Sequence, residues 1–336
     1  MGLCYSNKRK VRILNAYEIN TSVALKNILI RKKERNTSMK SKKNIKSALV
    51  VQGGGMRGVF SAGSLIALEK MGFSQGFDAV YGSSGGAMNA AYFLTKQCPF
   101  GASIYYEDIN NSKFINIFRI NRILDIDYLI DKVIRHKKPL DLHKLNNSQT
   151  PMYLFVTEAN TGKTIRFDSK SKNILKLLKA TCAVPILCNK TVSLNNRTYL
   201  DGAISKSIPI EEAIKDGCTD ILVLLTHSVK FRKSISFSNL FEKILVKKFL
   251  SKFSKKLVDT YLTGLKNYEQ AFDISLGVRK VKENIHIATI VPDDNFRVTR
   301  LTKDQILLKQ AAIDGAKKVF DLFNKNYNMN DILKYN

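Results

Sequence analysis

The sequence predicts a three-layer α/β/α domain with a mostly parallel central sheet. From residue 47 onward, strand-like apolar runs alternate with helical patterns, and the order is strand and then helix. Some of these runs, such as "DILVLLTH" at 220–227, are continuously apolar, which is typical of strands buried on both faces. With 336 residues, 44% of them hydrophobic, the chain is long enough to bury such a core.

The expected elements follow one another along the chain. The first half has strands at 48–52 and 77–81, helices at 58–71 and 84–95, and helical insertions over 111–135. Two hairpins follow at 152–167 and 190–202, separated by a helix that leads to Pro185. The second half has a helix at 209–217, the strand at 220–227, a long helical region over 236–275, a strand at 284–292 and a final helix at 302–325.

Composition excludes several classes of protein. No run of about 18 uncharged apolar residues predicts a transmembrane helix, and the first residues do not form a signal peptide. The five cysteines are odd in number and lack CxxC spacing, which argues against a disulfide framework and a zinc site. We therefore expect a cytoplasmic protein that binds no metal.

The chain is strongly basic, with a formal net charge of +27. Residues 1–48 hold thirteen Lys/Arg and two acids, for +11, and residues 230–257 hold nine and one, for +8. Such charge favours peripheral contact with an anionic membrane, although a compositional drift of the encoding genome explains it equally well. No helix-turn-helix, zinc-finger or RNA-binding signature is present, so no nucleic-acid partner is expected, and nothing indicates an oligomeric state.

The pattern divides the chain into three parts. Residues 1–45 form a basic, poorly patterned extension that we expect to be disordered, residues 46–325 form the domain, and residues 326–336 form a C-terminal tail. The start "MGLCYS" matches the N-myristoylation pattern at Gly2, with Cys4 available for a second acyl chain. Met39 is an alternative translation start.

A triple glycine follows the first predicted strand. The spacing Gly53-x-Gly55-x-x-Gly58 satisfies the dinucleotide fingerprint, in which backbone N–H groups approach a pyrophosphate. The same geometry suits the transient oxyanion of ester hydrolysis. The turn therefore predicts an anion site, and other motifs must decide which anion it holds.

A G-x-S-x-G motif follows the second predicted strand. Gly82-Ser83-Ser84-Gly85-Gly86 lies between an apolar strand and an apolar helix, the context that a nucleophile elbow requires. The flanking glycines, Gly82 and Gly86, remove side chains that would collide in so tight a turn. Ser84 is therefore the candidate nucleophile, and a glycine-serine loop without chemistry is the alternative.

A serine hydroxyl needs a base within hydrogen-bond reach. "RTYLDGAI" places Asp201 just past a short strand, and Gly202 after it allows close approach to another backbone. Asp201 is the candidate base, although, taken alone, the pair is more commonly an ordinary Asp-Gly turn.

Three motifs in one order, "GGGMRG", "GSSGG" and "DGA", resemble the patatin-like phospholipase family, and most closely its bacterial subgroup. The resemblance covers most of residues 45–325. It implies a patatin-like hydrolase domain that cleaves lipid or phospholipid acyl esters through a Ser84–Asp201 dyad without a cofactor. It also implies that Asp201, Gly202 and Ala203 form the Asp-Gly-Ala motif of the family. The oxyanion hole that it implies is formed by Gly53, Gly54, Gly55, Met56, Arg57 and Gly58.

Three alternatives stay open at this point. His227 ends an apolar strand, and the order Ser84, Asp201, His227 is that of the α/β-hydrolase triad, whereas His136, His143 and His286 are expected to be structural. A Rossmann-type nucleotide binder would need an acid at the end of the second strand, where Asp78 instead begins it. A basic membrane-binding protein without catalysis would owe its binding to charge alone.

Residues 239–257 have the pattern of a basic amphipathic helix. Apolar residues recur there at i, i+3 and i+4 spacing among six lysines. Such a helix can lie in a membrane interface. The alternative is that its apolar face packs on the domain.

Overall fold

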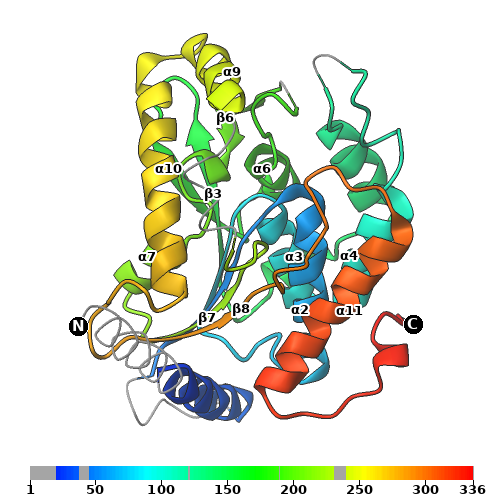
Figure 1. Ribbon diagram of the computed structural model, residues 1–336, viewed down its shortest axis with the longest axis vertical. Coiled ribbons are helices and arrows are strands. Elements are labelled where there is room, and N and C mark those ends of the chain that lie inside the picture. Colours follow the sequence, from blue (N-terminus) through cyan, green and yellow to red (C-terminus); the bar gives the residue numbers. More distant parts are fainter. Residues whose placement is uncertain (1–19, 38–44, 120–121, 189, 231–239, 336) are drawn as a thin grey trace, which may run out of the picture.

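Eight strands form one sheet at the centre of the computed structural model, which describes residues 20–37, 45–119, 122–188, 190–230 and 240–335 (Figure 1). The strands are β1 Ser47–Val51, β2 Ala79–Gly82, β3 Met152–Glu158, β4 Thr164–Asp168, β5 Val192–Leu194, β6 Arg197–Asp201, β7 Asp220–Leu224 and β8 His286–Ile290. Their order is β5-β6-β3-β2-β1-β7-β8, with β4 also paired to β3. Along the part of this order that runs β3-β2-β1-β7-β8, all neighbouring strands are parallel, as predicted. The strands β4, β5 and β6 add antiparallel pairs.

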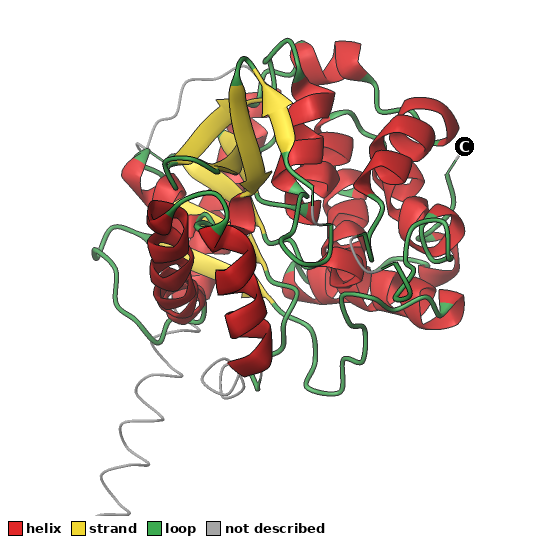
Figure 2. Ribbon diagram, turned by 90° about the horizontal axis from the view of Figure 1, so that it is seen from above, coloured by secondary structure: helices red, strands yellow, loops and turns green. Residues whose placement is uncertain are grey.

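Helices cover both faces of the sheet (Figures 1 and 2). One face carries α2 Gly58–Lys70, α3 Gly85–Leu94, α4 Cys98–Ser103, α5 Leu142–Asn146, α6 Ile174–Thr181 and α11 Gln305–Leu322. The other carries α7 Ile210–Lys215 and α10 Lys255–Ser275, with α9 Leu240–Ser251 beside α10. Short helical turns are η1 Gly55–Arg57, η2 Ile104–Asp108, η3 Tyr128–Lys137, η4 Gly202–Ile204 and η5 Met329–Asp331. The predicted three-layer α/β/α class is confirmed.

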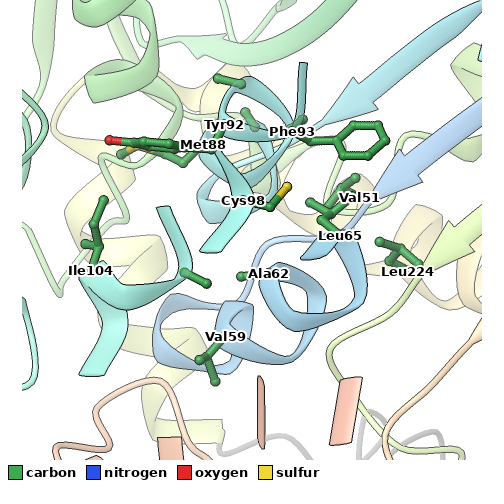
Figure 3. Close-up of a cluster of buried hydrophobic side chains, with 14 of the residues drawn as sticks. Val51, Val59, Ala62, Leu65, Met88, Tyr92, Phe93, Cys98, Ile104 and Leu224 are labelled. Carbon is green, nitrogen blue, oxygen red and sulfur yellow. The ribbon is translucent and has the colours of Figure 1, made fainter. Parts of the chain in front are cut away.

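Strand β1 shows why both faces need cover. Leu49 and Val51 belong to the larger apolar cluster, and Ala48 and Val50 belong to the cluster on the opposite face. All four are fully buried. Figure 3 shows part of the larger cluster, in which Val51 lies near side chains from α2, α3 and α4. A strand without a polar side is stable only between two layers of helices.

The register of β3 brings two distant chain segments end to end. β3 pairs with β2 up to Leu154↔Gly82 and with β6 from Val156↔Asp201 onward. β4 pairs with residues 153–157 of β3 and so occupies its other side, which leaves β2 and β6 on the same side. Because β6 runs antiparallel to β2, the carboxyl ends of the two strands face each other.

Two predicted segments differ from the structure. Residues 111–125 are not helical where described: the chain folds back on itself through an isolated bridge between Ile115 and Leu124, and a helical turn at 126–127 leads into the π-helical η3. The long helix at 236–275 is two helices, because Ser254 caps α10 by accepting a hydrogen bond from the Leu257 amide. The short helices α4 and α5 were not predicted.

Part of the predicted N-terminal extension packs on the domain. Residues 20–36 form a helix whose Arg31 binds Asp78 with N–O distances of 2.7 and 2.9 Å, and whose Asn27 donates to Asp220 at 2.8 Å. Residues 1–19 and 38–44, with the lipidation pattern and Met39, lie outside the described residues. No helix in the described ranges is long and apolar enough to span a bilayer.

Candidate active site

Ser84 lies in the turn between β2 and α3, in a conformation that is rare for a residue with a side chain. Its φ is 54° and its ψ is −136°. A Cβ atom on Gly82 would lie 2.7 Å from the Ala87 Cα, and one on Gly86 would lie 2.2 Å from the Val51 carbonyl oxygen. Both flanking positions therefore require glycine, as the sequence predicted.

Asp201 contacts Ser84 at the point where the carboxyl ends of β6 and β2 face each other. The Ser84 hydroxyl donates to the Asp201 Oδ2 atom at 2.9 Å, and the Ala203 amide donates to Oδ1 at 2.7 Å. A Cβ on Gly202 would lie 2.0 Å from the Phe155 carbonyl oxygen, so glycine allows the predicted close approach. The Asp-Gly-Ala sequence thus fixes the carboxylate relative to β3.

Burial makes Asp201 an unusual carboxyl group. It is 1% exposed, and desolvation raises its pKa to about 7, against the opposing effect of hydrogen bonds from Ala203 and Ser84. A carboxylate with such a pKa accepts a proton far more readily than one in water.

The glycine loop after β1 borders Ser84. Gly53 approaches the elbow so closely that a Cβ atom there would lie 2.7 Å from the Ser84 Cβ. The amides of Met56, Arg57 and Gly58 already donate to backbone carbonyl oxygens, among them those of Arg300 and Gly54. The amides of Gly53, Gly54 and Gly55 make no hydrogen bond within the described ranges. Only the first half of the predicted six-residue loop therefore offers free donors.

The amide of Gly85 is a further candidate donor, to which no role was assigned from the sequence. It immediately follows Ser84, and it makes no hydrogen bond to any described residue. The elbow motif itself carried the signal, because the amide after the nucleophile commonly serves as an oxyanion donor.

Ser84, Gly55 and Val184 border two cavities of different character. The first is apolar and is walled by α3, α4, η2 and the insertion up to η3, including Met88, Ile109, Phe114, Leu124 and Leu129. The second, which we call the polar cavity, has the charged or polar side chains of Asp201, Arg57, His227, Glu242 and Arg300 among apolar ones such as Val246 and Leu265. Ser84 thus lies where an apolar and a polar compartment meet.

Two arginines give the polar cavity its charge. Arg300 pairs with Glu242 at 2.8 Å, whereas the buried Nε of Arg57 has no hydrogen-bond partner among the described residues. Burial, followed by the neighbouring Arg300, lowers the pKa of Arg57 to about 10. The guanidinium remains charged at neutral pH.

His227 lines the same polar cavity but is held by other groups. Its Nδ1 lies 3.1 Å from the Tyr268 hydroxyl and 3.4 Å from the Gln52 amide nitrogen. Burial, with Arg57 and Arg300, lowers its pKa well below the ordinary value. The single hydroxyl hydrogen of Ser84 is donated to Asp201, so it is not available to this imidazole.

The comparisons identify the class of protein. Residues 49–214 match the model of the patatin-like phospholipase family, a span that contains the glycine loop, the elbow and the Asp-Gly-Ala sequence. These residues are therefore a patatin-like phospholipase domain. The glycine turn is therefore not a dinucleotide fingerprint, and the Rossmann-type alternative is wrong.

Individual proteins similar to this chain come from two bacteria. The uncharacterized protein YjjU of Escherichia coli (strain K12) is 30% identical over 185 residues, which cover 53% of this chain. The match spans about half, 51%, of that relative's length. The crystal structure of VipD from Legionella pneumophila is 12% identical, covering 84% of this chain and 67% of that one at a TM-score of 0.38, a similarity too low to carry an argument.

Proposed function

We propose that this protein is a serine esterase that hydrolyses acyl esters of lipids, with Ser84 as the nucleophile and Asp201 as the base. The observation that carries the proposal is the 2.9 Å hydrogen bond from the Ser84 hydroxyl to the buried Asp201 carboxylate. The patatin-like phospholipase domain at residues 49–214 supports the same chemistry.

In the first step the Ser84 Oγ attacks the ester carbonyl carbon, and its proton passes to the Asp201 Oδ2. The carbonyl oxygen becomes an oxyanion, and the free amides of Gly53, Gly54, Gly55 and Gly85 are the candidate donors for it. The intermediate collapses when the alcohol leaves with the proton from Asp201. An acyl ester on Ser84 remains.

In the second step water attacks the acyl-serine carbonyl carbon. Asp201 accepts the proton of that water and returns it to the Ser84 Oγ, which leaves as the hydroxyl and releases a carboxylic acid. The pKa of about 7 suits Asp201 to both directions of transfer.

The two cavities support an amphiphilic substrate. The apolar cavity suits an acyl chain, and the polar cavity suits an uncharged or anionic alcohol portion, because it holds Arg57, whose buried Nε has no partner among the described residues. A lipid or phospholipid ester has an apolar acyl chain on one side of the cleaved bond and a more polar alcohol portion on the other.

The test is labelling by a fluorophosphonate probe, together with ester hydrolysis, in matched serine variants. Ser84→Ala should abolish labelling and lower kcat by about a thousandfold or more. Ser83→Ala is the control, since the buried Ser83 hydroxyl has no hydrogen-bond partner in the described residues, and we expect it to retain both properties.

Two outcomes would contradict the proposal. Persistent labelling of Ser84→Ala with full hydrolysis would place the nucleophile elsewhere. Absence of labelling and hydrolysis in the wild-type protein, with salt-dependent vesicle binding intact, would favour the non-catalytic membrane-binding alternative.

A further inference from the structure

A short loop beside the apolar cavity exposes large apolar side chains. Residues 116–119, which we call the tip, follow Phe114 in the insertion. Phe118 is 88% exposed and Ile117 is 64% exposed, and no described residue covers them. Phe118 is the most exposed of the large hydrophobic residues in the described ranges.

The described part of the tip is held in place by hydrogen bonds. The Asn116 amide donates to the Ile123 carbonyl oxygen at 2.9 Å, and the Asn116 side chain accepts from the Phe118 amide at 3.0 Å. The Arg119 guanidinium donates to the Ser112 carbonyl oxygen at 2.5 Å and so links the tip to the preceding segment. The backbone around Phe118 is therefore fixed although its ring is largely exposed.

Three cations, Lys113, Arg119 and Arg122, lie close to the tip in the sequence. Lys113 is exposed, and Arg119 and Arg122 share the carboxylate of Asp125 at 3.4 and 3.5 Å. Arg122 also lies 3.8 Å from Asp127, so both arginines are paired with acids and Lys113 supplies the exposed positive charge of this segment. Exposed apolar side chains beside an exposed cation fit an anionic lipid surface.

The same segment forms part of the apolar cavity beside Ser84. Phe114 and Leu124, at the base of the folded-back segment, both line that cavity. The Leu124 amide donates to the Leu187 carbonyl oxygen at 2.8 Å, which ties the base to the chain after Val184. A lipid surface that bound the tip would thus lie next to the apolar cavity, which is suited to an acyl chain.

The basic helix singled out in the sequence has a different arrangement. In α9, Val246 and Leu250 are buried in a cluster with Leu200, Ile204 and Leu257, so this apolar side packs on the domain. Its Lys247 and Lys248 are exposed. In Figure 1, α9 and the segment that carries the tip lie at the same end of the molecule. α9 supplies charge there, and the tip supplies exposed apolar groups.

We propose that Ile117 and Phe118 insert into an anionic lipid surface and place the apolar cavity against it. The lipid role rests on the proposed function, but insertion itself can be measured without turnover. A second copy of the chain or another protein is a different occupant, and the test separates it.

The chain contains no tryptophan, so Phe118→Trp introduces a single fluorophore. With phosphatidylcholine/phosphatidylglycerol vesicles its emission should shift to the blue, and brominated lipid should quench it. Val278→Trp is the matched control. Val278 is 48% exposed and lies in the segment between α10 and β8, at the amino ends of the parallel strands, whereas Ser84 lies at their carboxyl ends, so its emission should not change.

Removing the apolar groups should weaken binding and interfacial catalysis together. Phe118→Asp should lower vesicle affinity by about tenfold or more, since burial of one aromatic side chain provides at least that factor. Hydrolysis of dispersed p-nitrophenyl butyrate should be unchanged, because Phe118 does not line either cavity. Val278→Asp should change neither property.

Three results would overturn the proposal. The first is vesicle binding by Phe118→Trp without a blue shift or quenching. The second is unchanged vesicle affinity of Phe118→Asp. The third is a protein dimer that Phe118→Asp dissociates, which would identify the tip as a contact between copies. Loss of the proposed function is distinct, since inactive Ser84→Ala should still bind vesicles through Phe118.

Discussion

The two walls that meet at Ser84 are built in different ways. The polar wall combines strand ends and tight turns with side chains from α9 and α10: the loop after β1, the elbow after β2, Asp201 at the end of β6 and His227 beyond β7 carry its reacting and polar groups. The apolar wall combines short helices and an insertion between β2 and β3, including the π-helical η2 and η3.

This difference separates chemistry from substrate fit. Strand ends are fixed by the register of the sheet, so they can hold reacting groups within a few tenths of an ångström. The insertion can change in length and side chains without altering that register. We expect changes in the polar wall to abolish the reaction and changes in the apolar wall to alter which ester is preferred.

The largest effect is expected from Gly86→Ala in the elbow. Its Cβ would lie 2.2 Å from the Val51 carbonyl oxygen, so α3 and β1 must separate. We expect a loss of about 3 kcal/mol or more in the free energy of unfolding, measured by urea denaturation. Gly85→Ala is the control, because its closest contact, at 3.3 Å, is the hydroxyl end of the Tyr105 side chain. Equal stability of the two variants would contradict this packing.

A smaller effect is expected from Asp201→Asn on stability, with a defined pH dependence. Because burial raises the folded-state pKa to about 7, folding disfavours the ionised carboxyl. Wild-type stability should fall as the pH rises from the unfolded value of about 4 through 7, and Asn cannot ionise. Asp201→Asn should therefore gain a few kcal/mol relative to wild type between pH 4 and 8. A pH-independent difference would show that burial does not perturb Asp201.

The smallest effect is expected from Leu129→Phe in the apolar wall. The larger side chain should narrow the cavity and lower kcat/KM for a long-chain ester by about tenfold. Hydrolysis of a butyrate ester by the same variant serves as the internal control and should change little. An equal loss on both esters would mean that this wall supports the reacting groups rather than the acyl chain.

The elements that frame the polar wall could be predicted from sequence, because short motifs encode them. Gly82, Gly86 and Gly202 each mark a backbone approach that the structure contains. The pairing of Ser84 with Asp201 could not be predicted from these motifs alone, since it depends on β2 and β6 lying on one side of β3. No local pattern records that register.

The apolar wall could not be predicted for a physical reason. Its side chains are ordinary core residues, and only their assembly from α3, η2, η3 and the chain after α6 leaves a space. The exposure of Phe118 could not be predicted either, because in the sequence this residue looks like any other apolar position. Hydrophobic periodicity also misjudged residues 236–275, because the cap at Ser254 interrupts a continuous helical pattern.

The measurement that tests the dyad most directly is kcat/KM of Asp201→Asn beside His227→Gln on one ester. If Asp201 is the base, Asp201→Asn should lose about a thousandfold or more, and His227→Gln should retain at least about a tenth of wild-type activity. The wild-type profile should fall below about pH 7, where Asp201 becomes protonated. A thousandfold loss in a well-folded His227→Gln protein would contradict the dyad and make His227 the base.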